Sequence, residues 1–173
     1  MSFSIPVPDR NDPQWTRSAG LFVRRGQGTH RTASGDVYTI KATAAETNGG
    51  LGLIEATVPS GGGPTAHAHG TEDEAFYILS GELEFLNGEE TFIGTPGDFI
   101  FIPRGTRHRF KNISVHAAKM LVMFTPGGHE QFFLDYQDEA QVGREPAEWG
   151  PEKYAELEEA VRQYQVTMLP EDQ

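Results

Sequence analysis

Residues 61–81 read GGGPTAHAHGTEDEAFYILSG, and the fold can be worked out from this stretch. His67 and His69 are two positions apart, so on a β-strand both side chains point to the same face of the sheet. Glu74 follows after a predicted bend and opens a second predicted strand, EAFYIL (74–79). Two imidazoles and a carboxylate are therefore expected on consecutive strands.

A third histidine belongs to a strand predicted further along the chain, where residues 107–112 read RHRFKN. Its basic side chains share one face, which we expect to be exposed to solvent: Arg107, Arg109 and Lys111. His108 lies on the opposite face with Phe110 and is expected to point into the interior. This strand therefore directs its cations outward and its imidazole inward.

Three imidazoles and one carboxylate that meet inside a β-barrel would form a site for a divalent transition metal ion. Donors of this kind suit Fe, Mn, Ni, Co, Cu or Zn, and four of them leave coordination positions free for water, substrate or dioxygen. Burying four such groups without a cation is energetically costly. We therefore expect one bound metal ion, whose identity the sequence does not determine.

From Leu21 to Phe124 the chain is a run of short segments with strand character, separated by Gly, Pro, Asn and Asp at a spacing typical of a sandwich or barrel. The predicted strands are 36–43, 51–58, 64–69, 74–80, 82–86, 90–93, 98–102, 106–112 and 118–124. Asn87-Gly88 joins two of them and predicts a type I′ hairpin.

The C-terminal part has a different pattern. The apolar side chains that recur there at helical spacing are Tyr154, Leu157, Val161 and Tyr164. With Pro151 at a suitable first position, they predict a short amphipathic helix over residues 151–164, packed on the outside of the barrel. We divide the chain into an N-terminal arm (1–20), a barrel (21–134) and a connector with the C-terminal helix (135–173).

Charge and composition narrow the range of partners. The 173 residues suit one domain. Asp and Glu outnumber Lys and Arg by 25 to 14, and a net charge of −11 argues against binding to nucleic acid or a membrane surface. The absence of cysteine excludes thiolate ligands and nucleophiles. Without a basic and apolar leader or a long apolar run, we expect a cytoplasmic protein.

Two motifs in this sequence resemble the pair that characterises the cupin superfamily. The first is G(x)5HAH(x)4E(x)6G, over residues 61–81, and the second is G(x)5PRG(x)2H(x)3N, over residues 97–112. Every defined position of both motifs is filled. Looser likeness extends from about Leu21 to Leu134.

The resemblance has consequences for the site and for the fold. The family's metal ligands are the two histidines and the glutamate of the first motif and the histidine of the second, which correspond to His67, His69, Glu74 and His108. The motif spacing favours Glu74 over Glu72, which we expect in a loop. The resemblance also implies an all-β antiparallel jelly-roll barrel, here with a short C-terminal helix, and a homodimer.

The family includes oxygenases, isomerases, decarboxylases and binding proteins, so the fold alone does not decide the function. The single barrel, the segment PGGHEQFF (126–133) and the C-terminal helix are loosely similar to bacterial quercetin 2,3-dioxygenase-like proteins. Our leading hypothesis is a metal-dependent dioxygenase for a small aromatic or enolisable substrate, with Glu74 as both ligand and general base. A non-redox isomerase, cyclase or lyase, and a non-catalytic small-molecule-binding protein, remain as alternatives.

Apolar side chains in register with the ligands are expected to lie mostly in the core, although some must line the substrate cavity. The candidates for the cavity are Phe76, Ile78 and Phe110. Phe99 and Phe101 are expected in the core. His129, which follows Pro126-Gly-Gly, is a candidate for the mouth of the barrel.

Overall fold

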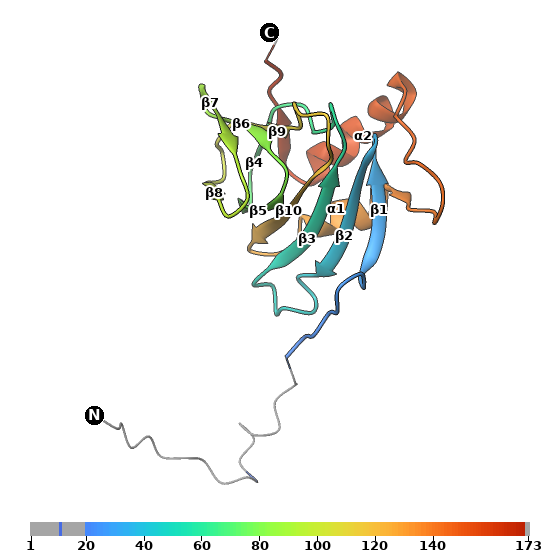
Figure 1. The fold of residues 1–173 in the computed structure, drawn as a ribbon. Coiled ribbons are helices and arrows are strands. Elements are labelled where there is room, and N and C mark those ends of the chain that lie inside the picture. Colours follow the sequence, from blue (N-terminus) through green and yellow to red (C-terminus); the bar gives the residue numbers. More distant parts are fainter. Residues whose placement is uncertain (1–10, 12–19, 172–173) are drawn as a thin grey trace, which may run out of the picture.

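The computed structural model describes residues 11 and 20–171, which form two antiparallel β-sheets and two helices (Figure 1). The larger sheet has the order β11-β1-β2-β3-β10-β5-β8, with strands β1 (Thr29–Ala33), β2 (Asp36–Ala42), β3 (Gly52–Val58), β5 (Asp73–Ser80), β8 (Phe99–Ile102), β10 (Ala118–Thr125) and β11 (Asp138–Glu139). The smaller sheet has the order β12-β4-β9-β6-β7, with strands β4 (His67–His69), β6 (Leu83–Asn87), β7 (Glu90–Gly94), β9 (His108–Lys111) and β12 (Val166–Met168).

The core lies between the two sheets, because the strands alternate apolar and polar side chains. In β3, for example, Ile54, Ala56 and Val58 are buried and the residues between them are partly exposed. Rings from both sheets meet in the core, where Phe76 of β5 lies 5.2 Å from Phe85 of β6, measured between ring centroids. This arrangement confirms the predicted all-β antiparallel barrel.

The helices follow the strands. The C-terminal helix α2 (Pro151–Gln163) begins at the proline predicted to start it, and it buries Leu157 and Ala160. A short helix, α1 (Glu130–Tyr136), was not predicted, and neither were β1, β11 and β12. These elements are short or mostly polar, so their periodicity is too weak to recognise. Among residues 20–171, no helix is long and apolar enough to cross a membrane.

The β6–β7 hairpin forms as expected, but its turn differs from the predicted type I′. Asn87 pairs with Glu90, so the two loop residues are Gly88 and Glu89. Only Gly88 of these two has a positive φ, of 65°. A type I′ turn needs positive φ at both central residues, so the turn is shifted by one position and is of another type.

Two predictions of exposure were wrong. Arg109 was expected to face solvent, yet it is 7% exposed, because acidic side chains from other segments cover it. Phe99 and Phe101 were expected in the core, but they are 60% and 47% exposed, while Ile100 and Ile102 of the same strand are buried. Alternation separates the two faces of a strand but does not say what covers each face.

The predicted N-terminal arm (1–20) lies almost wholly outside the described residues. The division of the chain at residues 134–135 remains a prediction. The C-terminal segment runs beside the barrel rather than away from it, because β12 is paired with β4 (Figure 1).

Candidate metal centre

Two strands of the smaller sheet and one of the larger sheet carry the four side chains that the motifs indicated. β4 provides His67 and His69, and β9 provides His108, which lies directly opposite His67 in the antiparallel pair. Glu74 comes from the other sheet, near the start of β5. The site therefore spans the gap between the sheets, with its imidazoles on one side and its carboxylate on the other.

One donor atom from each of these four residues lies within 4.8 Å of all the others. Glu74 Oε2 lies 2.7 Å from His108 Nε2 and 3.2 Å from His69 Nε2. The imidazole ring of His67 is 4.6 Å from that of His108, measured between centroids. We call these four residues the His3Glu cluster.

The cluster is shielded from solvent. His69, Glu74 and His108 are buried, and His67 is partly buried. Leaving a carboxylate and three imidazoles in such a place costs free energy unless a cation or a complete hydrogen-bond network satisfies them. The charged neighbours of the Glu74 carboxylate are imidazoles. Without a cation, the hydrogen-bond network around Glu74 would therefore depend on protons carried by these rings.

Two of the imidazoles are oriented by their own backbone. His67 Nδ1 lies 2.8 Å from the carbonyl oxygen of Thr65, and His108 Nδ1 lies 2.9 Å from that of Thr106. A carbonyl oxygen only accepts, so Nδ1 donates in both rings. Each ring therefore presents Nε2 to the cluster, as a metal ligand would.

The protonation of the cluster reflects its crowding. Burial raises the pKa of Glu74, but the hydrogen bond from His108 and the nearby imidazole of His69 outweigh this and hold it well below its usual range. Burial lowers the pKa of His69, but the nearby carboxylates of Glu72 and Glu74 prevail and raise it to about 9. Desolvation and the neighbouring imidazoles His108 and His69 lower the pKa of His67 to about 3.

These residues fit a metal ion. His69 Nε2 is buried close to Glu74 Oε2, but the angle between them does not suit a hydrogen bond, so this nitrogen is unpaired. An unpaired nitrogen and a carboxylate oxygen that face one common point are the arrangement expected around a cation. Three nitrogens and one oxygen suit a divalent transition metal, and the cluster could hold one.

Glu72 lies in the loop, as expected, but it is buried rather than exposed. Its carboxylate contacts the outer side of the His69 ring and also His129. Sequence reasoning did not predict this contact, because Glu72 and His129 lie in separate irregular segments. His129, a candidate for the mouth of the barrel, is buried against Glu72.

The predicted substrate-pocket residues lie in the hydrophobic core. Phe76, Ile78 and Phe110 are 1%, 1% and 5% exposed. Phe76 is near the cluster, with its ring centroid 6.3 Å from that of His108. None of the three lines either of two surface cavities, of about 240 and 690 Å³. Their contact with a substrate remains a prediction.

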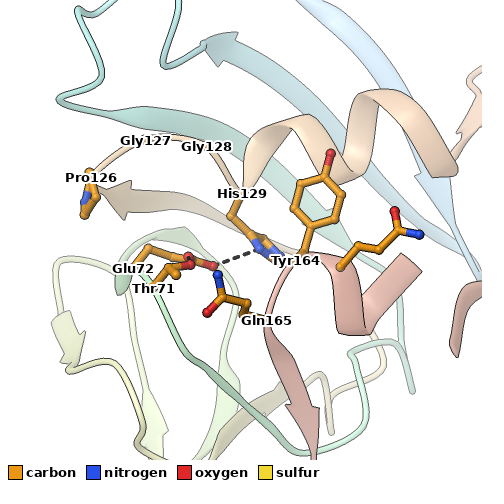
Figure 2. Close-up of a pocket in the computed structure, with 9 residues that line it drawn as sticks. Thr71, Glu72, Pro126, Gly127, Gly128, His129, Tyr164 and Gln165 are labelled. Atoms are coloured by element: carbon orange, nitrogen blue, oxygen red, sulfur yellow. Dashed lines mark hydrogen bonds and ion pairs between the residues drawn. The ribbon is translucent and has the colours of Figure 1, made fainter. Parts of the chain in front are cut away.

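The smaller cavity lies against Glu72 and His129 (Figure 2). Its wall is formed by three segments: Thr71 and Glu72, residues 126–129, and residues 163–165 at the end of α2. No member of the His3Glu cluster lines it, so Glu72 and His129 separate this cavity from the cluster.

Comparison with known proteins agrees with this fold. The cupin domain model matches residues 54–124, which include all four residues of the His3Glu cluster. Solved cupin structures also superpose on the barrel. Residues 54–124 of the chain are a cupin domain. The relatives of this cupin include quercetin 2,3-dioxygenase of Bacillus subtilis, which is 28% identical over 116 residues, covering 67% of this chain and 34% of that protein.

Two other proteins are similar to parts of this chain. An uncharacterized protein of Methanocaldococcus jannaschii is 38% identical over 79 residues, covering 45% of this cupin and 63% of that protein. This cupin thus spans about a third of the Bacillus relative and less than two thirds of the archaeal one. The structure of KdgF from Halomonas sp. superposes with a TM-score of 0.58 at 19% identity, covering 66% of this cupin and 99% of that chain, a likeness of fold alone.

Proposed function

We propose that this cupin binds one divalent transition metal ion through His67, His69, Glu74 and His108, and uses it as a dioxygenase for a small aromatic or enolisable substrate. The observation that carries the metal site is the buried convergence of these four side chains, with His69 Nε2 left unpaired. The reaction is supported by the Bacillus relative, a quercetin 2,3-dioxygenase that aligns with 67% of this chain.

Different residues of this cupin would have different roles in such a reaction. When bound, a redox-active ion supplies Lewis acidity toward the oxyanion of the substrate and electron transfer toward dioxygen. When displaced from the ion, Glu74 would accept the proton of the substrate hydroxyl group at Oε2, the oxygen that faces the cluster. Phe76, beside His108, helps to exclude water from the reacting atoms.

Oxygen consumption tests this function directly. The purified protein is loaded in turn with Fe(II), Mn(II), Co(II) and Ni(II), and oxygen uptake is followed with a panel of flavonols and 1,3-diketones. We expect uptake with at least one redox-active ion and none with Zn(II) or with the His69→Ala variant. Turnover of a substrate under anaerobic conditions with Zn(II) would instead identify a non-redox isomerase, cyclase or lyase.

We also propose that this cupin forms a homodimer through the outer face of β5 and β8. β8 is an edge strand, and Tyr77 and Phe99 are directly opposite each other across the β5–β8 pair. The exposed fractions on this face are 40% for Tyr77, 43% for Leu79, 60% for Phe99 and 47% for Phe101. A cluster of exposed apolar side chains on an edge is a surface that another chain commonly covers.

A further inference from the structure

The third imidazole of the cluster is oriented differently from the other two. His67 and His108 each donate Nδ1–H to a backbone carbonyl two positions earlier in the chain. His69 instead directs Nδ1 to a side chain, and its Nδ1 lies 2.8 Å from Glu72 Oε1. The orientation of the His69 ring therefore depends on the side chain of Glu72, which a substitution can remove.

Glu72 is itself held from two further sides. His129 Nδ1 lies 2.9 Å from the same Oε1 atom, and the Thr71 hydroxyl donates to Oε2. Glu72 is 5% exposed and His129 is 7% exposed. One buried carboxylate oxygen thus lies between two imidazoles, with His69 toward the cluster and His129 toward the cavity of Figure 2.

His69, Glu72 and His129 also form a group that could hold a metal ion, but with no cation among them each of the two short contacts requires a proton on the nitrogen. Their lengths are those of charge-assisted hydrogen bonds, but the rings are turned so that neither contact has hydrogen-bond angles. A nitrogen lone pair and a carboxylate oxygen this close would repel each other. Nδ1 of both rings therefore carries the hydrogen, and a small rotation of the rings aligns it. With Nδ1 protonated, His69 offers Nε2 to the cluster.

We infer that Glu72 is a positioning residue for the metal centre, which fixes the tautomer and the angle of His69, and that His129 holds Glu72 in place from the cavity side. This inference rests on the metal binding proposed above. A carboxylate partner on the second nitrogen of a ligating histidine orients the ring and increases its donor strength. Glu72 does so for the one ligand that lacks a carbonyl partner.

His129 is placed for this role by a rigid aromatic setting. Its ring centroid lies 4.8 Å from that of Phe124 and 5.6 Å from that of Phe132, against which it is stacked. It also lies 4.3 Å from the ring of His69. Packing on several sides leaves the ring little freedom to turn away from Glu72.

The metal dissociation constant measures the role of Glu72. Competition with a chromophoric chelator gives this constant for Zn(II) and Co(II), in wild type and in Glu72→Gln. Loss of an outer partner of this kind typically costs about 10–100-fold in affinity, and we expect Glu72→Gln to weaken binding by that factor. Glu89→Gln, which removes an exposed carboxylate in the β6–β7 turn, is the matched control and should leave the constant unchanged.

A double-mutant cycle tells positioning from simple charge attraction. If Glu72 acts through His69, Glu72→Gln should have little further effect in a His69→Ala background. An equal loss in both backgrounds would overturn the inference, since Glu72 would then act on the ion directly. Likewise, His129→Phe should weaken binding less than Glu72→Gln, and should add nothing to it in the double variant.

The number of shifted histidine resonances in the wild-type protein is a test that does not depend on any variant folding. In the Co(II)-loaded protein, each histidine bound through Nε2 contributes one exchangeable, strongly shifted Nδ1–H proton resonance. We expect three such resonances, of which His69→Ala removes one. Only two resonances in the wild type, or a second bound ion that is lost in His129→Phe, would overturn the inference. If the wild type bound no metal, the proposed function itself would fall, whereas equal affinities of wild type and Glu72→Gln would remove only the role of Glu72.

Discussion

Arg109 and Glu171, 62 positions apart in the chain, form a two-point ion pair, with Nε 2.8 Å from Oε2 and an Nη atom 3.0 Å from Oε1. Arg109 adjoins the proposed metal ligand His108 on β9, and Glu171 follows the C-terminal strand β12. This ion pair holds the segment that follows β12 against the smaller sheet. β12 in turn pairs with β4, so that Val166 is opposite His69 and Met168 is opposite His67. The strand that carries two of the proposed ligands therefore has the C-terminal segment as its neighbour.

A chain that ends at Tyr164 should be less stable and should bind metal more weakly. The truncation removes β12 together with contacts such as the hydrogen bond from Gly70 N to Gln165 O and that from Arg107 to Leu169 O. At about 1 kcal/mol for each net hydrogen bond, we expect a loss of roughly 2–4 kcal/mol and a fall in melting temperature of roughly 5–15 °C. Calorimetry and the metal dissociation constant measure the two effects.

Glu171→Gln is the matched control for this truncation, because it weakens the ion pair and keeps β12. It should cost no more than about 1 kcal/mol, since Glu171 is partly exposed. If the truncated chain bound metal as tightly as the full chain, β12 would have no part in ordering His67 and His69.

Removal of a proposed ligand should reduce the metal content. We expect His69→Ala and His108→Ala each to weaken metal binding by more than the roughly 10–100-fold typical of an outer partner. Elemental analysis after dialysis against a chelator measures this. His116→Ala, which removes an exposed histidine, should keep the wild-type content. A fully loaded His108→Ala variant would be incompatible with the proposed site.

Asp36 should make the protein less stable as the pH rises from about 4 to 7. Burial raises its pKa to about 7, although a hydrogen bond from the Tyr38 hydroxyl opposes the shift. In this range the folded state holds a proton that the unfolded chain has released, so stability falls with pH and then levels off above pH 7. Asp36→Asn should therefore be more stable than wild type at pH 8, by at most about 4 kcal/mol, and little changed at pH 4.

Urea unfolding of both proteins between pH 4 and 8 measures this difference. Asp98→Asn is a control of opposite sign, because hydrogen bonds from the Thr95 amide and hydroxyl lower the pKa of Asp98. The ionised side chain of Asp98 stabilises the folded protein at neutral pH, and this effect is lost as the pH falls. Asp98→Asn should therefore lower stability at pH 8. An Asp36→Asn variant with the same pH dependence as wild type would show that Asp36 is ionised in the folded protein.

Phe99→Glu should dissociate the proposed homodimer. The substitution places a charge in the middle of the exposed apolar face and leaves the core unaffected, because the Phe99 side chain points outward. Light scattering coupled to size-exclusion chromatography should show a dimer for wild type and a monomer for the variant. Val142→Glu, at another exposed apolar position, should remain dimeric. A monomeric wild type at micromolar concentration would refute the proposal.

Most of the barrel strands could be predicted from the sequence, because their alternation is strong and glycine, proline and asparagine mark their ends. The strand β9 shows the limit of this reasoning. Alternation correctly directed His108 inward, but it also predicted an exposed Arg109. That residue is covered by Glu84 and Glu171, which come from another strand and from the end of the chain. Coverage of this kind depends on contacts between distant segments and leaves no periodic signal.

The sequence by itself determined the His3Glu cluster, since the pleat of a strand places His67 with His69 and directs His108 inward, and the spacing of two motifs selects Glu74. Only the tertiary structure decided what surrounds it. Glu72 and His129 belong to irregular segments without a period, and they meet at His69 because the barrel closes and the C-terminal segment packs against β4. Local backbone geometry determines which way a side chain points, whereas closure of the chain determines what that side chain meets.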